Sequence, residues 1–78
     1  MTNDAATTDA ATVSVTVNGK GTEVPAGTSL LGLVESLGRD PRTVAIEHNG
    51  EIVGRAAYGD RVLGEGDRLE IVHFVQGG

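Results

Sequence analysis

The sequence contains no cysteine and no tryptophan, and it has one phenylalanine and one tyrosine among 78 residues. Without a thiol, the chain itself forms no disulfide, no thiolate-bound metal cluster and no cysteine nucleophile, which fits a reducing compartment. Two aromatic side chains are too few for a platform on which nucleic-acid bases stack. These absences exclude a cysteine-ligated iron–sulfur protein, thiol redox chemistry and a base-stacking module.

Positive charge is also scarce, because six Lys and Arg stand against 11 Asp and Glu and give a net charge of −5. This balance argues against a phosphate backbone as partner. No apolar run approaches the roughly 18 residues of a membrane span. The opening residues, MTNDAATTDA, lack the basic and apolar regions of a secretory signal. We therefore expect a cytoplasmic protein that contacts neither nucleic acid nor membrane.

The length of 78 residues suits one small domain with a single core. Residues 1–11 show no amphipathic period, and we expect them to form a disordered tail. We place the folded domain at residues 12–75. Residues 76–78 should form a flexible tail, because glycine is the most costly residue to order.

Alternating valines and an Asn-Gly pair predict a hairpin at the start of the domain. Residues 13–17 alternate apolar and polar side chains, as a half-buried strand does. Asn18-Gly19 supplies the positive φ angles of a tight turn, and residues 22–24 return as the second strand.

A helix and three further strands should follow. Thr28 or Ser29 can cap a helix that runs to Leu37, with Gly38 as the residue after its C-cap. The later strands are predicted at residues 43–48, 51–53 and 68–75. The first two are joined by a turn at Asn49-Gly50, and a long polar connection with little regular structure precedes the third.

This order of elements predicts an α+β protein with a β-grasp fold. One helix packs on a mixed sheet of four or five strands, and the last strand returns to the centre of the sheet. The predicted core consists of Val13, Val15, Val17, Leu30, Val34, Leu37, Val44, Ile46, Leu69 and Ile71.

The chemically capable side chains give no candidate active site. His48 and His73 lie on different predicted strands without a metal-ligating neighbour, so both are expected at the surface. Ser29 has no specific relation to a histidine and an aspartate. Gly64-x-Gly66 lacks the third glycine of a dinucleotide motif and leads into a strand, which predicts an ordinary turn. We therefore expect no catalytic residue, no metal site and no bound cofactor.

The last strand raises a question of parity. If Leu69 and Ile71 face the core, Val72 and Phe74 face outward although both are apolar. Two interpretations are open at this point. The pair forms a docking surface, or it packs beneath a neighbouring loop near Tyr58.

Three stretches of the sequence carry a family resemblance. VTVNGKGTEVPAGTSLLGLVESL, VAIEHNGEIVGR and GDRLEIVHFVQGG together resemble the ubiquitin-like sulfur carriers, most closely the ThiS family. The resemblance covers residues 13–78. The sequence departs from the family pattern in its N-terminal extension and in Gly54-Arg55, where the family more often has Pro-Arg.

The resemblance implies a carrier rather than an enzyme. An E1-like adenylyltransferase of the ThiF type would use ATP to adenylate the Gly78 carboxylate. A sulfur donor would then displace AMP and leave a thiocarboxylate, which a thiazole synthase of the ThiG type would use to build the thiazole ring of thiamine. Gly77 and Gly78 would let the tail enter a narrow channel, since neither has a Cβ atom. The residues expected to bind partners are Val72, Phe74, Val75 and Gln76.

Three alternatives remain open on the sequence alone. A molybdopterin-synthase small subunit shares the fold and the glycine tail. A ubiquitin-like protein modifier also needs the two glycines. A plain β-grasp interaction domain needs neither Gly77 nor Gly78.

Overall fold

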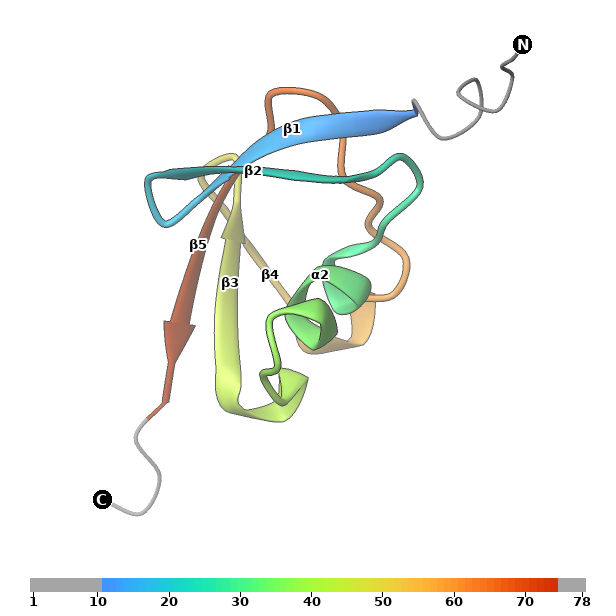
Figure 1. Cartoon of the computed structure of the whole chain (residues 1–78). Helices are drawn as coiled ribbons and strands as arrows, with labels where there is room; N and C mark the ends of the chain where they lie inside the picture. The colour runs from blue at the N-terminus through green and yellow to red at the C-terminus, as the bar shows by residue number, and fades with distance from the viewer. Residues whose placement is uncertain (1–10, 75–78) are drawn as a thin grey trace, which may run out of the picture.

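The computed structural model describes residues 11–74, which form a five-stranded mixed sheet with one α-helix and two short 3-10 helices (Figure 1). The strands are β1 (Thr12–Val17), β2 (Lys20–Pro25), β3 (Val44–His48), β4 (Glu51–Val53) and β5 (Arg68–His73). The helices are α2 (Leu30–Ser36), η1 (Pro41–Thr43) and η2 (Arg55–Ala57). The predicted tails, at residues 1–11 and 76–78, lie outside the described residues except for Ala11.

The sheet has the strand order β2-β1-β5-β3-β4. The last strand, β5, lies in the centre, parallel to β1 and antiparallel to β3. Helix α2 connects the first hairpin to the later strands and covers one face of the sheet (Figure 1). The predicted α+β β-grasp architecture is therefore confirmed.

Both Asn-Gly pairs form the tight turns that the sequence predicts. Asn18 and Gly19 have φ angles of 51° and 82°, and Asn49 and Gly50 have φ angles of 53° and 87°. Two consecutive positive φ angles match the right-handed twist of the flanking strands. The turns therefore fix the registers of the β1–β2 and β3–β4 hairpins.

Helix α2 is capped at both ends by the predicted residues. The Ser29 hydroxyl accepts a hydrogen bond of 3.0 Å from the backbone N–H of Gly32. At the other end Gly38 has a φ angle of 76°, and the N–H groups of Gly38 and Arg39 donate back to helix carbonyls. This is the pattern of a Schellman motif, which satisfies otherwise unpaired carbonyl groups.

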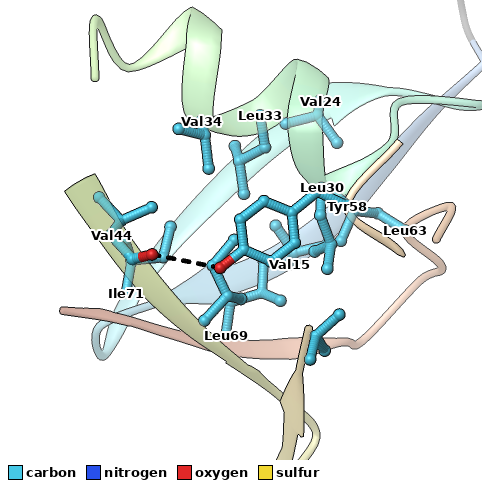
Figure 2. Packing of buried hydrophobic residues seen from close by; sticks show 12 residues of the cluster. Val15, Val24, Leu30, Leu33, Val34, Val44, Tyr58, Leu63, Leu69 and Ile71 are labelled. Atoms are coloured by element: carbon cyan, nitrogen blue, oxygen red, sulfur yellow. Dashed lines mark hydrogen bonds between the residues drawn. The ribbon is translucent and has the colours of Figure 1, made fainter. Parts of the chain in front are cut away.

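Most of the predicted core is buried between α2 and the sheet (Figure 2). Val13 and Val17 are half-buried and pack against this cluster. Leu37 is a wrong prediction, because its side chain is 45% exposed. It is the C-cap residue of α2, so the helical spacing that would place it on the buried stripe ends one residue earlier.

The connection between β4 and β5 contributes more to the core than the sequence predicts. Tyr58 and Leu63 are buried, and the Tyr58 hydroxyl donates a hydrogen bond of 3.2 Å to the backbone carbonyl of Val44 (Figure 2). The Leu63 N–H donates to the Thr28 carbonyl, while the Leu30 N–H donates to the Arg61 carbonyl. This segment is therefore tied to the start of α2. Further buried residues outside the predicted core are Val24, Leu33 and Val53.

Candidate docking surface

The outer face of β5 carries apolar side chains that the domain itself leaves uncovered. Val72 is 59% exposed and Phe74 is 47% exposed, whereas Leu69 and Ile71 are buried. The predicted outward parity is therefore confirmed. Tyr58 points into the core (Figure 2), so the alternative in which Val72 and Phe74 pack beside it is wrong.

The neighbouring strands extend this apolar surface. Ile52 on β4 is 78% exposed, and it lines a shallow hollow of about 390 Å³ together with Ala45 on β3 and Val72 on β5. We call the side chains of Ala45, Ile52, Val72 and Phe74 the outer-face patch. Sequence reasoning missed Ile52, because a three-residue strand in which two neighbouring residues are apolar does not indicate which of them faces the core.

Two carboxylates border the outer-face patch. Glu47 and Glu70 also line the hollow, and they lie directly opposite each other on β3 and β5. Like charges in such a cross-strand pair repel each other, and Arg68, which lines a neighbouring hollow with both carboxylates, offsets part of this repulsion. A partner that brings positive charge to this border would relieve the repulsion, so the patch suits an apolar surface surrounded by basic residues.

His48 is not at the surface, which corrects the sequence-based expectation. Its residue is 8% exposed, and its Nε2 atom lies 2.7 Å from Oδ2 of Asp67. Its Nδ1 atom lies 3.3 Å from Nη1 of Arg61. The reason is strand parity: Val44 and Ile46 face the core, and His48 is the next residue on that side of β3. His73 is exposed, as predicted.

Asp67 organises the loop that leads into β5. Its carboxylate accepts hydrogen bonds from the backbone N–H of Gly64 at 2.8 Å and from Nδ2 of Asn49 at 3.1 Å. Burial opposes ionisation of Asp67, but these bonds and the contact with His48 outweigh it and lower the pKa of this carboxyl. Gly66, with a φ angle of 84°, completes a turn, so the Gly64-x-Gly66 segment is structural as predicted.

The ionised Asp67 should stabilise the fold. We expect Asp67→Asn to reduce the free energy of unfolding at pH 7 by about 1–3 kcal/mol, because Gly64, Asn49 and the buried His48 lose charge-assisted hydrogen bonds. The lowered pKa means that this contribution is present above about pH 4, the pKa of an unfolded aspartate, and is lost as the pH falls through the folded-state value. Urea denaturation of both proteins across this range measures the difference.

Asp40 provides the matched control for this measurement. Its pKa is lowered to about 2, chiefly by a side-chain hydrogen bond from Arg42, but the pair is exposed to solvent. Asp40→Asn should therefore cost less than Asp67→Asn, since solvent screens exposed ion pairs. Equal losses in the two variants, or a loss in Asp67→Asn that is the same at every pH, would contradict the assigned role.

Residues 11–74 contain no group of three side chains that could hold a metal ion, and no helix in that range is long and apolar enough to cross a membrane. The structure brings Val72 and Phe74 onto one surface as expected. The other predicted site residues, Val75, Gln76, Gly77 and Gly78, lie outside the described range. The described part is a folded domain whose central strand, β5, carries part of an exposed apolar patch.

One α-helix packed on a mixed sheet with the strand order β2-β1-β5-β3-β4 is the β-grasp fold of the ubiquitin-like class. The chain matches the model of the ThiS family over residues 9–78. It is 30% identical to the thiamine biosynthesis protein (ThiS) from Geobacter metallireducens, whose crystal structure superposes with a TM-score of 0.72 over 85% of this chain and 100% of that one. The solution structure of a thiamine biosynthesis protein from the same organism gives a TM-score of 0.69, at 30% identity over 85% of this chain and 88% of the other. The chain belongs to the ThiS family.

Similar sequences also occur inside longer proteins. The chain is 44% identical over 66 residues to a thiazole synthase from Magnetococcus marinus, covering 85% of this chain and 20% of that protein. A thiazole synthase from Paramagnetospirillum magneticum is 38% identical over 66 residues, with the same coverage. The chain thus spans about a fifth of the length of these curated relatives.

Proposed function

We propose that this protein is the sulfur carrier for thiazole formation in thiamine biosynthesis and that Gly78 carries the sulfur. The observation that supports this most strongly is the match to the ThiS family over residues 9–78, which includes the Gly77-Gly78 pair. The central position of β5 adds a physical reason. The start of β5 is paired on both sides, and β3 pairs with it as far as His73, so the strand is an ordered base for the C-terminal segment that partner enzymes would bind.

The proposed chemistry takes place at the end of the chain. The Gly78 carboxylate attacks the α-phosphate of ATP and releases pyrophosphate, which gives an acyl-adenylate. The terminal sulfur of a donor persulfide then attacks the acyl carbon, and AMP leaves. Reduction of the resulting acyl disulfide by a thiol gives the thiocarboxylate. The carrier provides no acid or base for these steps, and ATP is bound by the activating enzyme.

Two partner enzymes follow from this proposal. An E1-like adenylyltransferase of the ThiF type would activate Gly78, and a thiazole synthase of the ThiG type would receive the sulfur. The second is supported by the relatives named thiazole synthase, in which a similar segment covers a fifth of the protein. The outer-face patch, bordered by Glu47 and Glu70, is the surface that we assign to the activating enzyme.

The outer-face patch gives a matched pair of valine variants. Val72 and Val62 are 59% and 57% exposed, but only Val72 lies on the patch. We expect Phe74→Ala and Val72→Ala to weaken binding to the activating enzyme by about 1–3 kcal/mol, because truncation removes apolar contact from the interface. Val62→Ala should bind normally. Titration calorimetry measures the affinities, and a melting curve for each variant checks the fold.

Two results would contradict this assignment. Equal affinities of the Val72 and Val62 variants would mean that the patch does not contact the activating enzyme. Unfolding of Phe74→Ala would mean that this side chain supports the core, despite its exposure of 47%.

The pathway itself is tested by reconstitution. The thiocarboxylated protein, mixed with thiazole synthase and its other substrates, should support formation of the thiazole ring, and the carboxylate form should not. The decisive comparison uses the large subunit of molybdopterin synthase in a parallel reaction. Sulfur transfer there, without transfer in the thiazole synthase reaction, would replace the thiamine proposal with the molybdopterin alternative.

A further inference from the structure

A second hollow lies on the opposite side of the sheet from the outer-face patch. It has a volume of about 390 Å³ and lies between the β1–β2 turn, the end of α2 and β5. We call it the inner hollow. Its lining residues are Val17, Asn18, Lys20, Leu37, Arg39 and Ile71. None of them belongs to the outer-face patch.

Ile71 of β5 lines the inner hollow, and the edge of β5 that faces β1 runs past this residue to His73. The N–H of Phe74 donates to the carbonyl of Thr43, the residue before β3. Because backbone groups of successive strand residues point to opposite sides, those of Leu69, Ile71 and His73 point toward β1. The Leu69 carbonyl accepts a hydrogen bond from the N–H of Asn18, in line with this alternation.

Strand β1 runs beside only the first part of β5, so the later residues of β5 have no neighbouring strand on that side in the described part of the chain. Its pairing with β5 reaches only Arg68 and Leu69. After β1 ends, the side-chain amide of Asn18 takes the place of a strand residue opposite Ile71. Its Oδ1 atom accepts a hydrogen bond from the N–H of Ile71 at 2.7 Å, and its Nδ2 atom donates to the Ile71 carbonyl at 3.1 Å. His73 lies beyond this amide, and β5 continues past the β1–β2 turn (Figure 1). Within residues 11–74 no strand lies beside His73 on this side.

The inner hollow also carries an uncovered apolar side chain and two cations. Leu37 is 45% exposed at its border. Lys20 and Arg39 are exposed, and neither forms a salt bridge with another side chain of the described chain. In a protein with a net charge of −5, two such cations at one hollow form a local site for negative charge.

We propose that the inner hollow binds an extended acidic segment of a partner protein by strand addition at His73. The backbone of the segment would pair with the open edge of β5, as in β-augmentation. Alternate side chains would place an apolar group on Leu37 and a carboxylate between Lys20 and Arg39. This proposal does not depend on the proposed function, because it rests only on the edge, the exposed leucine and the charges.

The two surfaces would then select different partner surfaces. The outer-face patch has an acidic border at Glu47 and Glu70, and the inner hollow has Lys20 and Arg39. They lie on opposite faces of the same strand, so one partner segment could occupy each without a clash. Because their charges are opposite, a segment that fits one surface is disfavoured at the other.

The test is a titration of the full-length, ¹⁵N-labelled protein with a blocked hexapeptide, acetyl-Thr-Val-Thr-Glu-Thr-Glu-amide, whose Val and Glu side chains lie on one face of an extended strand, followed by two-dimensional NMR. We expect saturable shifts of the amide signals of Lys20, Leu37, Arg39, Ile71 and His73. The double variant Lys20→Ala, Arg39→Ala should raise the Kd about fivefold to tenfold, because two exposed ion pairs are lost. Higher salt should also raise the Kd of the native protein, because it screens the same ion pairs.

Matched controls use the same protein and peptide length. Arg68→Ala removes a cation from the outer side of the sheet and should leave the Kd unchanged, and a peptide with Lys in place of Glu should not bind. No saturable shifts at millimolar peptide, or shifts centred on the outer-face patch, would overturn the proposal. It is also overturned if the signals of the hollow move on dilution of the protein alone, which indicates a second copy, or on removal of residues 75–78, which indicates the chain's own end as the occupant.

Discussion

Deletion of Gly78 should abolish activation of the protein while leaving its fold intact. We expect the rate of ATP–pyrophosphate exchange with the cognate activating enzyme to fall at least about a hundredfold, because a misplacement of about 1 Å already costs that much. Removal of one residue shifts the carboxylate by roughly 3.3–3.6 Å, and reacting atoms must approach to about 3–3.5 Å. The free energy of unfolding, obtained from a melting curve of the same preparation, should change by less than about 0.5 kcal/mol, because the core residues precede the deleted glycine.

The opposite end of the chain provides the control for this deletion. Removal of residues 2–8 also shortens the chain. These residues precede β1, which begins at Thr12, so the rate of ATP–pyrophosphate exchange should stay unchanged. Addition of one residue after Gly78 should be as harmful as the deletion, because the carboxylate again misses the α-phosphate. Normal exchange by a well-folded protein without Gly78 would contradict the carrier function and favour a plain interaction domain.

Leu69→Ala should produce the largest loss of stability among the variants considered. Leu69 is 1% exposed on β5, in the centre of the sheet, and it packs in the main core cluster (Figure 2). Truncation of a buried leucine costs about 2–5 kcal/mol, since it removes apolar contacts and leaves a cavity. For a domain of this size we expect the Tm to fall by at least about 10 °C.

Its neighbour on the same strand supplies the comparison. Glu70 is exposed on the outer side of β5 and lies opposite Glu47. Glu70→Ala should leave the Tm nearly unchanged or raise it slightly, because it removes a repulsive pair. Similar losses of Tm in Leu69→Ala and Glu70→Ala would show that the alternation of buried and exposed side chains along β5 is wrong.

The local elements could be predicted from the sequence because their signals are short-range. Asn18-Gly19 and Asn49-Gly50 determine two turns through backbone conformations that few other residue pairs adopt. Ser29 and Gly38 mark the two ends of α2 in the same way. The outward direction of Val72 also followed from strand parity alone.

Several of the errors concern contacts between segments far apart in the sequence. Tyr58 and Leu63 lie in a stretch without periodicity, and only the folded chain shows that they close the core beside α2. His48 looked like a surface residue because its partner, Asp67, is 19 positions away. Its burial could have been predicted from the parity of Val44 and Ile46 on the same strand.

The inner hollow could not be predicted from the sequence for the same reason. It depends on where β1 stops relative to β5, and no local pattern gives the relative lengths of two paired strands. The hydrogen bonds between the Asn18 amide and the backbone of Ile71, which end the paired part of this edge, join residues 53 positions apart. The exposure of Leu37 likewise depends on the residue at which α2 ends.

The central claim is that Gly78 carries sulfur, and intact-mass spectrometry tests it most directly. The protein is incubated with the activating enzyme, ATP and a sulfur donor, and control reactions each omit one component. We predict a mass increase equal to the difference between one sulfur atom and one oxygen atom, only in the complete reaction, with fragmentation placing it on the peptide that ends at Gly78. An unchanged mass in a complete reaction, when the same enzyme preparation converts another ThiS-family carrier, would contradict the account.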